Sequence, residues 1–139
     1  SFNGVDFYDD YAHHPTEIKM TLDGVKKVYK DYEKVCVFQP HRISRLRDLR
    51  REFSFSFRNA DMVILCPVYS AGEKIKLGFS YFKFAKEIIK NSNVDLIMVN
   101  GEKELAKFVK KNIYGNNIVI GMGAGSISSW IRNLPVLLK

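Results

Sequence analysis

Five short apolar runs alternate with longer amphipathic segments, and this pattern limits the folds open to the 139-residue chain. The runs read as strands and are Val5–Tyr8, Val35–Phe38, Met62–Cys66, Val94–Val99 and Ile118–Ile120. Strands that alternate with helices favour a parallel sheet covered on both faces. We therefore predict a single α/β domain over residues 1–139, with a Rossmann-like, doubly wound, mostly parallel sheet of five or six strands.

The segments between the runs have apolar residues at helical spacing. A helix is predicted from Pro15 onward, a second over residues 43–57, a third over residues 79–89, a fourth around Leu105, and a last one over Ile127–Leu138. The second is expected to bury Ile43, Leu46, Leu49, Phe53 and Phe57, and the third to bury Phe79, Phe82, Ala85, Ile88 and Ile89.

Composition narrows the class of protein. The hydrophobic fraction of 46% is typical of a folded domain, and no apolar stretch approaches the roughly 20 residues of a membrane span. We expect a cytoplasmic protein, one domain of a longer chain, with Cys36 and Cys66 as buried, reduced thiols. The formal charge is +7, but five of the seven arginines fall between Arg42 and Arg51, which indicates a local anion site.

Four polar loops follow four of the predicted strands. They contain the sequences DDYAHHP, QPHRISR, PVYSAGE and GMGAGS. In open α/β sheets, ligands bind beyond the carboxyl ends of the strands. If these strands are parallel, the four loops meet at one edge and form one site there.

The first loop concentrates titratable groups in residues 9–17, DDYAHHPTE. Asp9, Asp10, His13 and His14 could bind a metal, could place hydrogen bonds and charge against a ligand, or could serve as a turn and a helix cap. We favour hydrogen bonding, with one histidine facing the ligand and the other structural, and we assign no metal ligands.

Arg42 and Arg45 are expected in the first turn of the second helix, on one side. Cations oppose the helix dipole there, so the arrangement favours a bound anion. Two guanidinium groups and free backbone amides would bind a carboxylate or phosphate. The alternative, a solvated basic helix, suits Arg47, Arg50 and Arg51.

The other two loops carry weaker signals. Glu73 is the expected polar contact of the YSAGE loop, residues 69–73. Gly121, Gly123 and Gly125 read as a tight strand–helix junction. The chain has no GxxxxGK[ST] phosphate loop, so we do not expect it to bind and cleave ATP alone.

DDYAHHPTE, FQPHRISR, YSAGE and MGAG, in this order, resemble the C-terminal domain of the Mur ligases. The motifs are most similar to those of the member that joins L-alanine to UDP-N-acetylmuramic acid in peptidoglycan synthesis. The resemblance implies a three-domain, ATP- and Mg²⁺-dependent enzyme with an acyl phosphate intermediate. A central domain would hold most of the ATP and Mg²⁺ contacts, and this domain would close over the site.

The same resemblance implies roles for individual residues. His13, Arg42 and Arg45 would bind the amino acid, with the arginines on its carboxylate, and Tyr11 would line that pocket. Asp10 would face the nucleotide. Supporting positions would be Asp9, His14, His41 and Glu73.

Two departures accompany the resemblance. Ser126 replaces the usual aspartate of the glycine turn, and Ile43 replaces a common aromatic residue. One alternative is the related ligase that recycles murein tripeptide, although the FQPHR segment argues against it. Another is a stand-alone module that binds anions or nucleic acid, which predicts salt-sensitive nucleic-acid binding without a partner domain.

Overall fold

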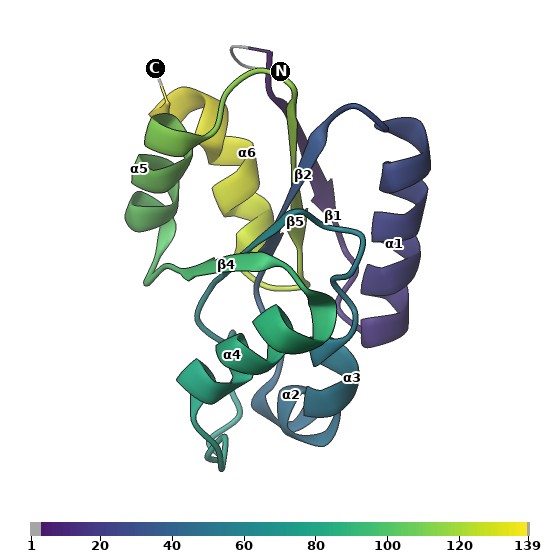
Figure 1. Ribbon diagram of the computed structural model, residues 1–139. Helices are drawn as coiled ribbons and strands as arrows, with labels where there is room; N and C mark the ends of the chain where they lie inside the picture. Colours follow the sequence, from purple (N-terminus) through teal and green to yellow (C-terminus); the bar gives the residue numbers. More distant parts are fainter. Residues whose placement is uncertain (1–3, 139) are drawn as a thin grey trace.

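Five parallel strands form the sheet of the computed structural model, which describes residues 4–138 (Figure 1). In order across the sheet they are β1 (Asp6–Asp10), β5 (Asn117–Met122), β2 (Glu33–Phe38), β3 (Met62–Leu65) and β4 (Asp95–Met98). Every neighbouring pair is parallel. The predicted α/β class and parallel sheet are confirmed, with five strands.

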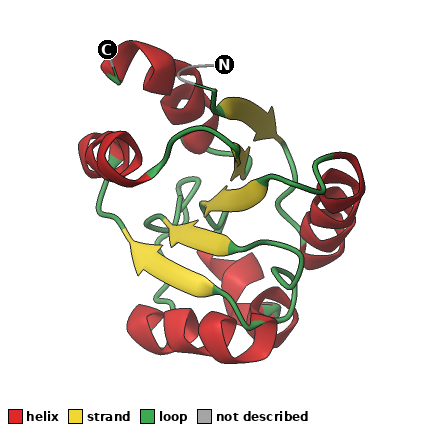
Figure 2. Cartoon of the chain, turned by 45° about the horizontal axis from the view of Figure 1, so that its top comes forward, coloured by secondary structure: helices red, strands yellow, loops and turns green. Residues whose placement is uncertain are grey.

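Six helices within residues 4–138 cover both faces of the sheet. They are α1 (Pro15–Val28), α2 (Ile43–Asp48), α3 (Arg50–Ser54), α4 (Tyr81–Ser92), α5 (Glu102–Asn112) and α6 (Ile127–Leu137). The core residues that α1 to α4 contribute belong to one cluster, and those of α5 and α6 belong to a second. Figure 2 shows α1 and α5 on opposite sides of the sheet.

Strand β2 contributes side chains to both core clusters. Val35 and Val37 point into the α5–α6 cluster, while Cys36 and Phe38 point into the α1–α4 cluster. Successive side chains of a strand face opposite ways, so a strand covered on both faces is apolar throughout. Both cysteines are free and buried, as predicted.

The predicted helix over residues 43–57 is two short helices. Leu49, with φ −114° and ψ 20°, ends α2 and precedes α3. The break lets both pieces bury an apolar residue, Leu46 from α2 and Phe53 from α3. The ring of Phe53 then packs against Phe38 of β2, with 5.4 Å between centroids.

The predicted buried face of α4 is partly wrong. Phe82 and Ile89 are 60% and 43% exposed, whereas Phe84, Ala85 and Ile88 are buried. Phe79 lies before the helix and packs its ring against Phe84. The side of α4 that packs against the rest of the domain therefore differs from the predicted one, because it includes Phe84 and leaves Phe82 and Ile89 exposed.

Gly121 allows α6 to approach β5 closely. A Cβ atom on Gly121 would lie 2.3 Å from Cγ1 of Ile131 in α6. We expect Gly121→Ala to destabilise the domain by about 1–3 kcal/mol, because overpacking forces a backbone or rotamer shift. Urea unfolding would measure the change.

Gly24 provides the matched control. It lies within α1 and a Cβ atom there would meet nothing within 4 Å. Gly24→Ala should therefore stabilise the domain by up to about 1 kcal/mol through helix propensity. Equal effects of the two substitutions would contradict the packing argument.

Candidate functional site

The four polar loops meet at the carboxyl edge of the sheet, as their parallel strands require. The His13 and His41 ring centroids, from the loops after β1 and β2, are 6.0 Å apart. His41 in turn stacks on Tyr69 from the loop after β3. Gln39 donates a 2.9 Å hydrogen bond to Ser126, which follows β5. The predicted convergence is confirmed.

His13 and Tyr11 form one wall of this site. Tyr11 is exposed, and its ring meets the His13 ring edge-on with 5.1 Å between centroids. Nδ1 of His13 lies 2.8 Å from the Tyr11 carbonyl oxygen. Because a carbonyl only accepts, Nδ1 must carry the proton, which fixes the tautomer and the ring orientation.

His14 begins helix α1. Its Nδ1 accepts from the Thr16 amide, and the Glu17 carboxylate accepts from the His14 amide, which completes a capping box. The backbone amides of His13 and His14 lower the pKa of Glu17. His14 therefore has a local structural contact, whereas the His13 ring faces the other loops.

The two aspartates of the first loop have separate contacts. Asp9 lies at the end of β1 and accepts a short hydrogen bond from the Ser128 hydroxyl in α6. Asp10 accepts a 2.8 Å bond from the Ala12 amide, which closes a turn. Asp9 thus joins β1 to α6, and Asp10 shapes the loop that carries Tyr11 and His13.

Arg42 and Arg45 lie on the His41 side of the edge. Arg42 immediately precedes α2 and has φ 75°, a value that side-chain-bearing residues rarely adopt. Its amide donates to the Tyr69 carbonyl at 2.8 Å. Within residues 4–138, no protein group bonds to the Arg42 guanidinium. Arg45 is half-buried, with one guanidinium nitrogen 3.4 Å from both Nδ1 and the carbonyl oxygen of His41.

The surroundings of His41 disfavour its protonated form. Burial lowers its pKa, and the nearby charge of Arg45 lowers it further. An unprotonated Nδ1 can accept a hydrogen bond from the Arg45 guanidinium. The histidine therefore orients an arginine without repelling it.

Glu73 occupies the amino end of α2. One carboxylate oxygen accepts from the Ser44 amide at 3.1 Å, and the other from the Ser44 hydroxyl at 2.5 Å. The first-turn amide that we expected to be free for an anion is thus already satisfied within the chain. The guanidinium groups of Arg42 and Arg45 remain as the cationic part of the site.

Arg50 does not fit the predicted solvated basic helix. It forms two hydrogen bonds with Glu87 of α4, at 2.7 and 3.0 Å, and its guanidinium lies 4.2 Å from the Phe79 ring centroid. A bidentate, half-buried pair of this kind holds α3 against α4. Arg47 is exposed beside Asp48, as expected.

Sequence reasoning missed Gln39, which is buried at the centre of the edge. Its side-chain nitrogen donates to the Ser126 hydroxyl, and its side-chain oxygen accepts from the Ile127 amide at 3.0 Å. It therefore fixes the start of α6 to the end of β2. A polar residue directly after a fully apolar strand was the available signal.

Gly125 confirms the tight strand–helix junction. A Cβ atom there would lie 2.5 Å from Cγ of the Tyr69 ring and 2.9 Å from the Gln39 side-chain oxygen. The glycine is explained by close packing of two protein groups.

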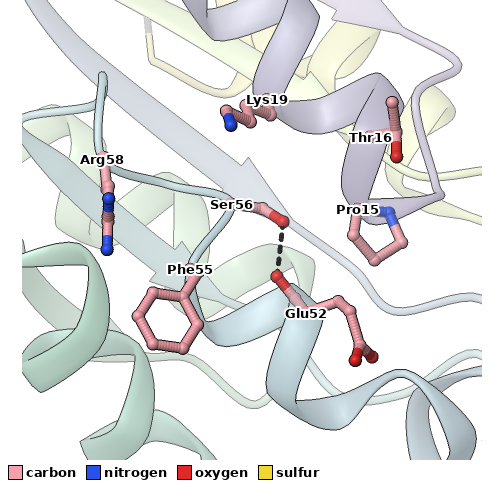
Figure 3. A pocket seen from close by; sticks show the side chains of 7 residues that line it. All are labelled: Pro15, Thr16, Lys19, Glu52, Phe55, Ser56 and Arg58. Carbon is pink, nitrogen blue, oxygen red and sulfur yellow. Dashed lines mark hydrogen bonds between the residues drawn. The ribbon is translucent and has the colours of Figure 1, made fainter.

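A separate pocket of about 260 Å³ lies beside this edge, between the start of α1 and the segment that follows α3 (Figure 3). Pro15, Thr16, Lys19, Glu52, Phe55, Ser56 and Arg58 line it. In Figure 3 the Ser56 hydroxyl points to the backbone of Glu52, to which it donates. None of the predicted site residues lines this pocket.

Between Gly4 and Leu138, no three His, Cys, Asp or Glu side chains form a group suited to a metal ion. Over the same range, no helix is long and apolar enough to cross a membrane.

The family model for the Mur ligase glutamate ligase domain matches residues 1–125. The chain is 64% identical over 132 residues to the UDP-N-acetylmuramate–L-alanine ligase of Pelagibacter ubique, which covers 95% of this chain and 28% of that protein. It is 38% identical to the enzyme of the same name from Mesorhizobium japonicum, over 97% of this chain and 29% of that one. The chain thus spans less than a third of these relatives.

Solved structures agree on the fold. A UDP-N-acetylmuramate–alanine ligase from Thermotoga maritima is 26% identical with a TM-score of 0.73, over 95% of this chain and 26% of that one. A murein peptide ligase from Psychrobacter arcticus is 20% identical with a TM-score of 0.76, over 99% and 28%. The second likeness concerns the fold alone.

The Glu73 contacts predict a pH effect on stability. Hydrogen bonds from Ser44 lower the pKa of Glu73 below its ordinary value of 4.5. A carboxylate with a lowered pKa stabilises the fold above that value, and the contribution is lost as pH falls through the folded-state pKa. Glu73→Gln should therefore lower the free energy of unfolding at pH 7, and the difference from wild type should shrink below about pH 4.5.

Chemical denaturation of wild type and variant between pH 7 and pH 3 would measure this difference. Glu33→Gln is the control, because Glu33 is exposed at the start of β2. A constant difference for Glu73→Gln across the range would contradict the role of its charge.

Proposed function

The chain belongs to the Mur ligase family, and from this membership we propose that it is the C-terminal, amino-acid-binding domain of a three-domain enzyme. The enzyme would join L-alanine to UDP-N-acetylmuramate at the expense of ATP. Support comes from 64% identity to a relative named UDP-N-acetylmuramate–L-alanine ligase. The chain covers 28% of that relative's length. The remaining domains would lie outside these 139 residues.

The observation that carries the proposal is the pair of arginines at the sheet edge. The Arg45 guanidinium lies against His41, and the Arg42 guanidinium has no protein partner within the described residues. A carboxylate is a suitable ligand for two such groups, since charge-assisted and bidentate hydrogen bonds are among the strongest in proteins. The amino acid's carboxylate would occupy this position.

His13 and Tyr11 would form the rest of the amino-acid pocket. Their rings lie at the same edge as His41, and His13 is oriented by its bond to the Tyr11 carbonyl oxygen. The size of the exposed Tyr11 ring would limit the pocket to an amino acid with a small side chain, such as L-alanine. Asp10 would face the nucleotide.

ATP and Mg²⁺ would be bound mainly by the central domain. Residues 4–138 include no cluster of ligands that fits a metal ion, and the sequence has no phosphate loop. The part of this chain in the reaction is to bind the amine substrate, orient it and exclude water when the domains close. We place the enzyme in the bacterial cytoplasm, where ATP is available.

In the reaction, a carboxylate oxygen of the muramyl group attacks the terminal phosphorus of ATP and releases ADP. The amine of L-alanine then attacks the acyl carbon, and phosphate leaves as the amide forms. Fixing the L-alanine carboxylate on Arg42 and Arg45 would direct its amine toward the acyl carbon. Water excluded from the closed site could not compete for the acyl phosphate.

The full-length enzyme is expected to release phosphate only when UDP-N-acetylmuramate and L-alanine are both present. The isolated chain should show neither ligase nor ATPase activity, because it lacks the phosphate-binding machinery. A coupled phosphate assay would measure both. Preference for murein tripeptide over L-alanine, or turnover by the isolated chain, would refute the proposal.

Arg42→Ala in the full-length enzyme should raise the KM for L-alanine by roughly 10- to 100-fold, as expected when one charge-assisted hydrogen bond is lost. Arg47→Ala is the matched control, since Arg47 is an exposed arginine of α2, the helix that Arg42 precedes. Its L-alanine KM should stay at the wild-type value. Steady-state kinetics would compare them, and an unchanged KM for Arg42→Ala would remove Arg42 from the site.

A further inference from the structure

We infer that Tyr69 is a positioning residue for Arg42 and Arg45, a role that rests on the proposed function. Tyr69 follows β3 and lies between the loops that follow β2 and β5. Three sets of contacts carry the inference: its backbone, the stacking of its ring on His41, and the close approach of its ring to Gly125.

The backbone of Tyr69 continues the sheet past the ends of its strands. Its amide donates to the Pro40 carbonyl and its carbonyl accepts from the Arg42 amide, both at 2.8 Å, so that His41 and Tyr69 form a parallel bridge. Arg42 has φ 75°, which a residue with a side chain adopts only where its surroundings enforce it. The bond to Tyr69 is the contact that holds the Arg42 amide in that conformation.

The ring of Tyr69 acts on Arg45 through His41. The two rings stack with 5.6 Å between centroids and 16° between planes. On the same imidazole, Nδ1 lies 3.4 Å from a guanidinium nitrogen of Arg45. The Tyr69 ring thus fixes the plane of the histidine that orients the arginine.

The Tyr69 ring also packs closely against the junction after β5. A Cβ atom on Gly125 would lie 2.5 Å from Cγ and 2.7 Å from Cδ1 of Tyr69. The ring therefore contacts both His41 and the backbone at Gly125. Loops from three strands meet at this one side chain.

The flat face of the ring, and not its hydroxyl group, makes these contacts. Within residues 4–138, the Tyr69 hydroxyl forms no hydrogen bond, and the residue is 40% exposed. Phenylalanine should therefore replace Tyr69 without loss, whereas alanine should leave His41 and Arg45 free to reorient. The pair separates a role in positioning from a role of the hydroxyl in chemistry.

The test uses the full-length enzyme with Tyr69→Ala, Tyr69→Phe and the control Tyr114→Ala. Tyr114 is an exposed tyrosine before β5, at the opposite edge of the sheet. Tyr69→Ala should raise the L-alanine KM roughly tenfold, the size expected for loss of one aromatic contact, with the ATP KM unchanged. Tyr69→Phe and Tyr114→Ala should keep the wild-type L-alanine KM.

A merely structural role would lower the active fraction, so kcat would fall in Tyr69→Ala at an unchanged L-alanine KM. That result would overturn the inference, as would a raised KM in Tyr69→Phe. A second measurement is the ring-current shift of the His41 imidazole protons by NMR, assigned with His41→Asn. The shift should persist in Tyr69→Phe and disappear in Tyr69→Ala, and its persistence in Tyr69→Ala would also overturn the inference.

The two measurements separate this inference from the proposed function. If the wild-type enzyme shows no turnover with L-alanine, the proposed function fails. The NMR comparison does not depend on substrate, and it still decides whether Tyr69 holds His41.

Discussion

The pairing of β2 with a strand on each side is the constraint on which the site depends. Because β2 is flanked by β5 and β3 in parallel register, the segment after it emerges at the middle of the carboxyl edge. Gln39 then reaches the start of α6, and His41 reaches the loops after β1 and β3. A shift of this one strand by a residue would exchange its two faces and separate these contacts.

The charges near this edge are organised before any ligand binds. Glu73 satisfies the first turn of α2, and Glu87 takes both hydrogen bonds of Arg50. The Arg45 guanidinium lies 3.4 Å from Nδ1 of His41, and within residues 4–138 the Arg42 guanidinium has no protein partner. Such an arrangement reduces the reorganisation that binding requires, because the competing carboxylates are already engaged elsewhere.

The sequence supported the strand count, the parallel sheet and the meeting of the loops, because these follow from apolar periodicity and from strand direction. It could not predict the break at Leu49 or the exposure of Phe82, since periodicity does not say which helical side a neighbour will cover. Gln39 and Tyr69 were missed because their contacts join loops far apart in sequence. The roles assigned to His13, Arg42 and Arg45 remain predictions.

The backbone at Arg42 has an evolutionary consequence. A residue with a side chain at φ 75° costs the fold about 1–3 kcal/mol, and glycine would avoid most of that cost. Directed evolution for heat resistance alone should therefore enrich glycine at this position, and variants recovered in that way would lack the guanidinium that we propose binds the amino acid. Under that proposal, heat resistance and substrate binding favour different residues at position 42.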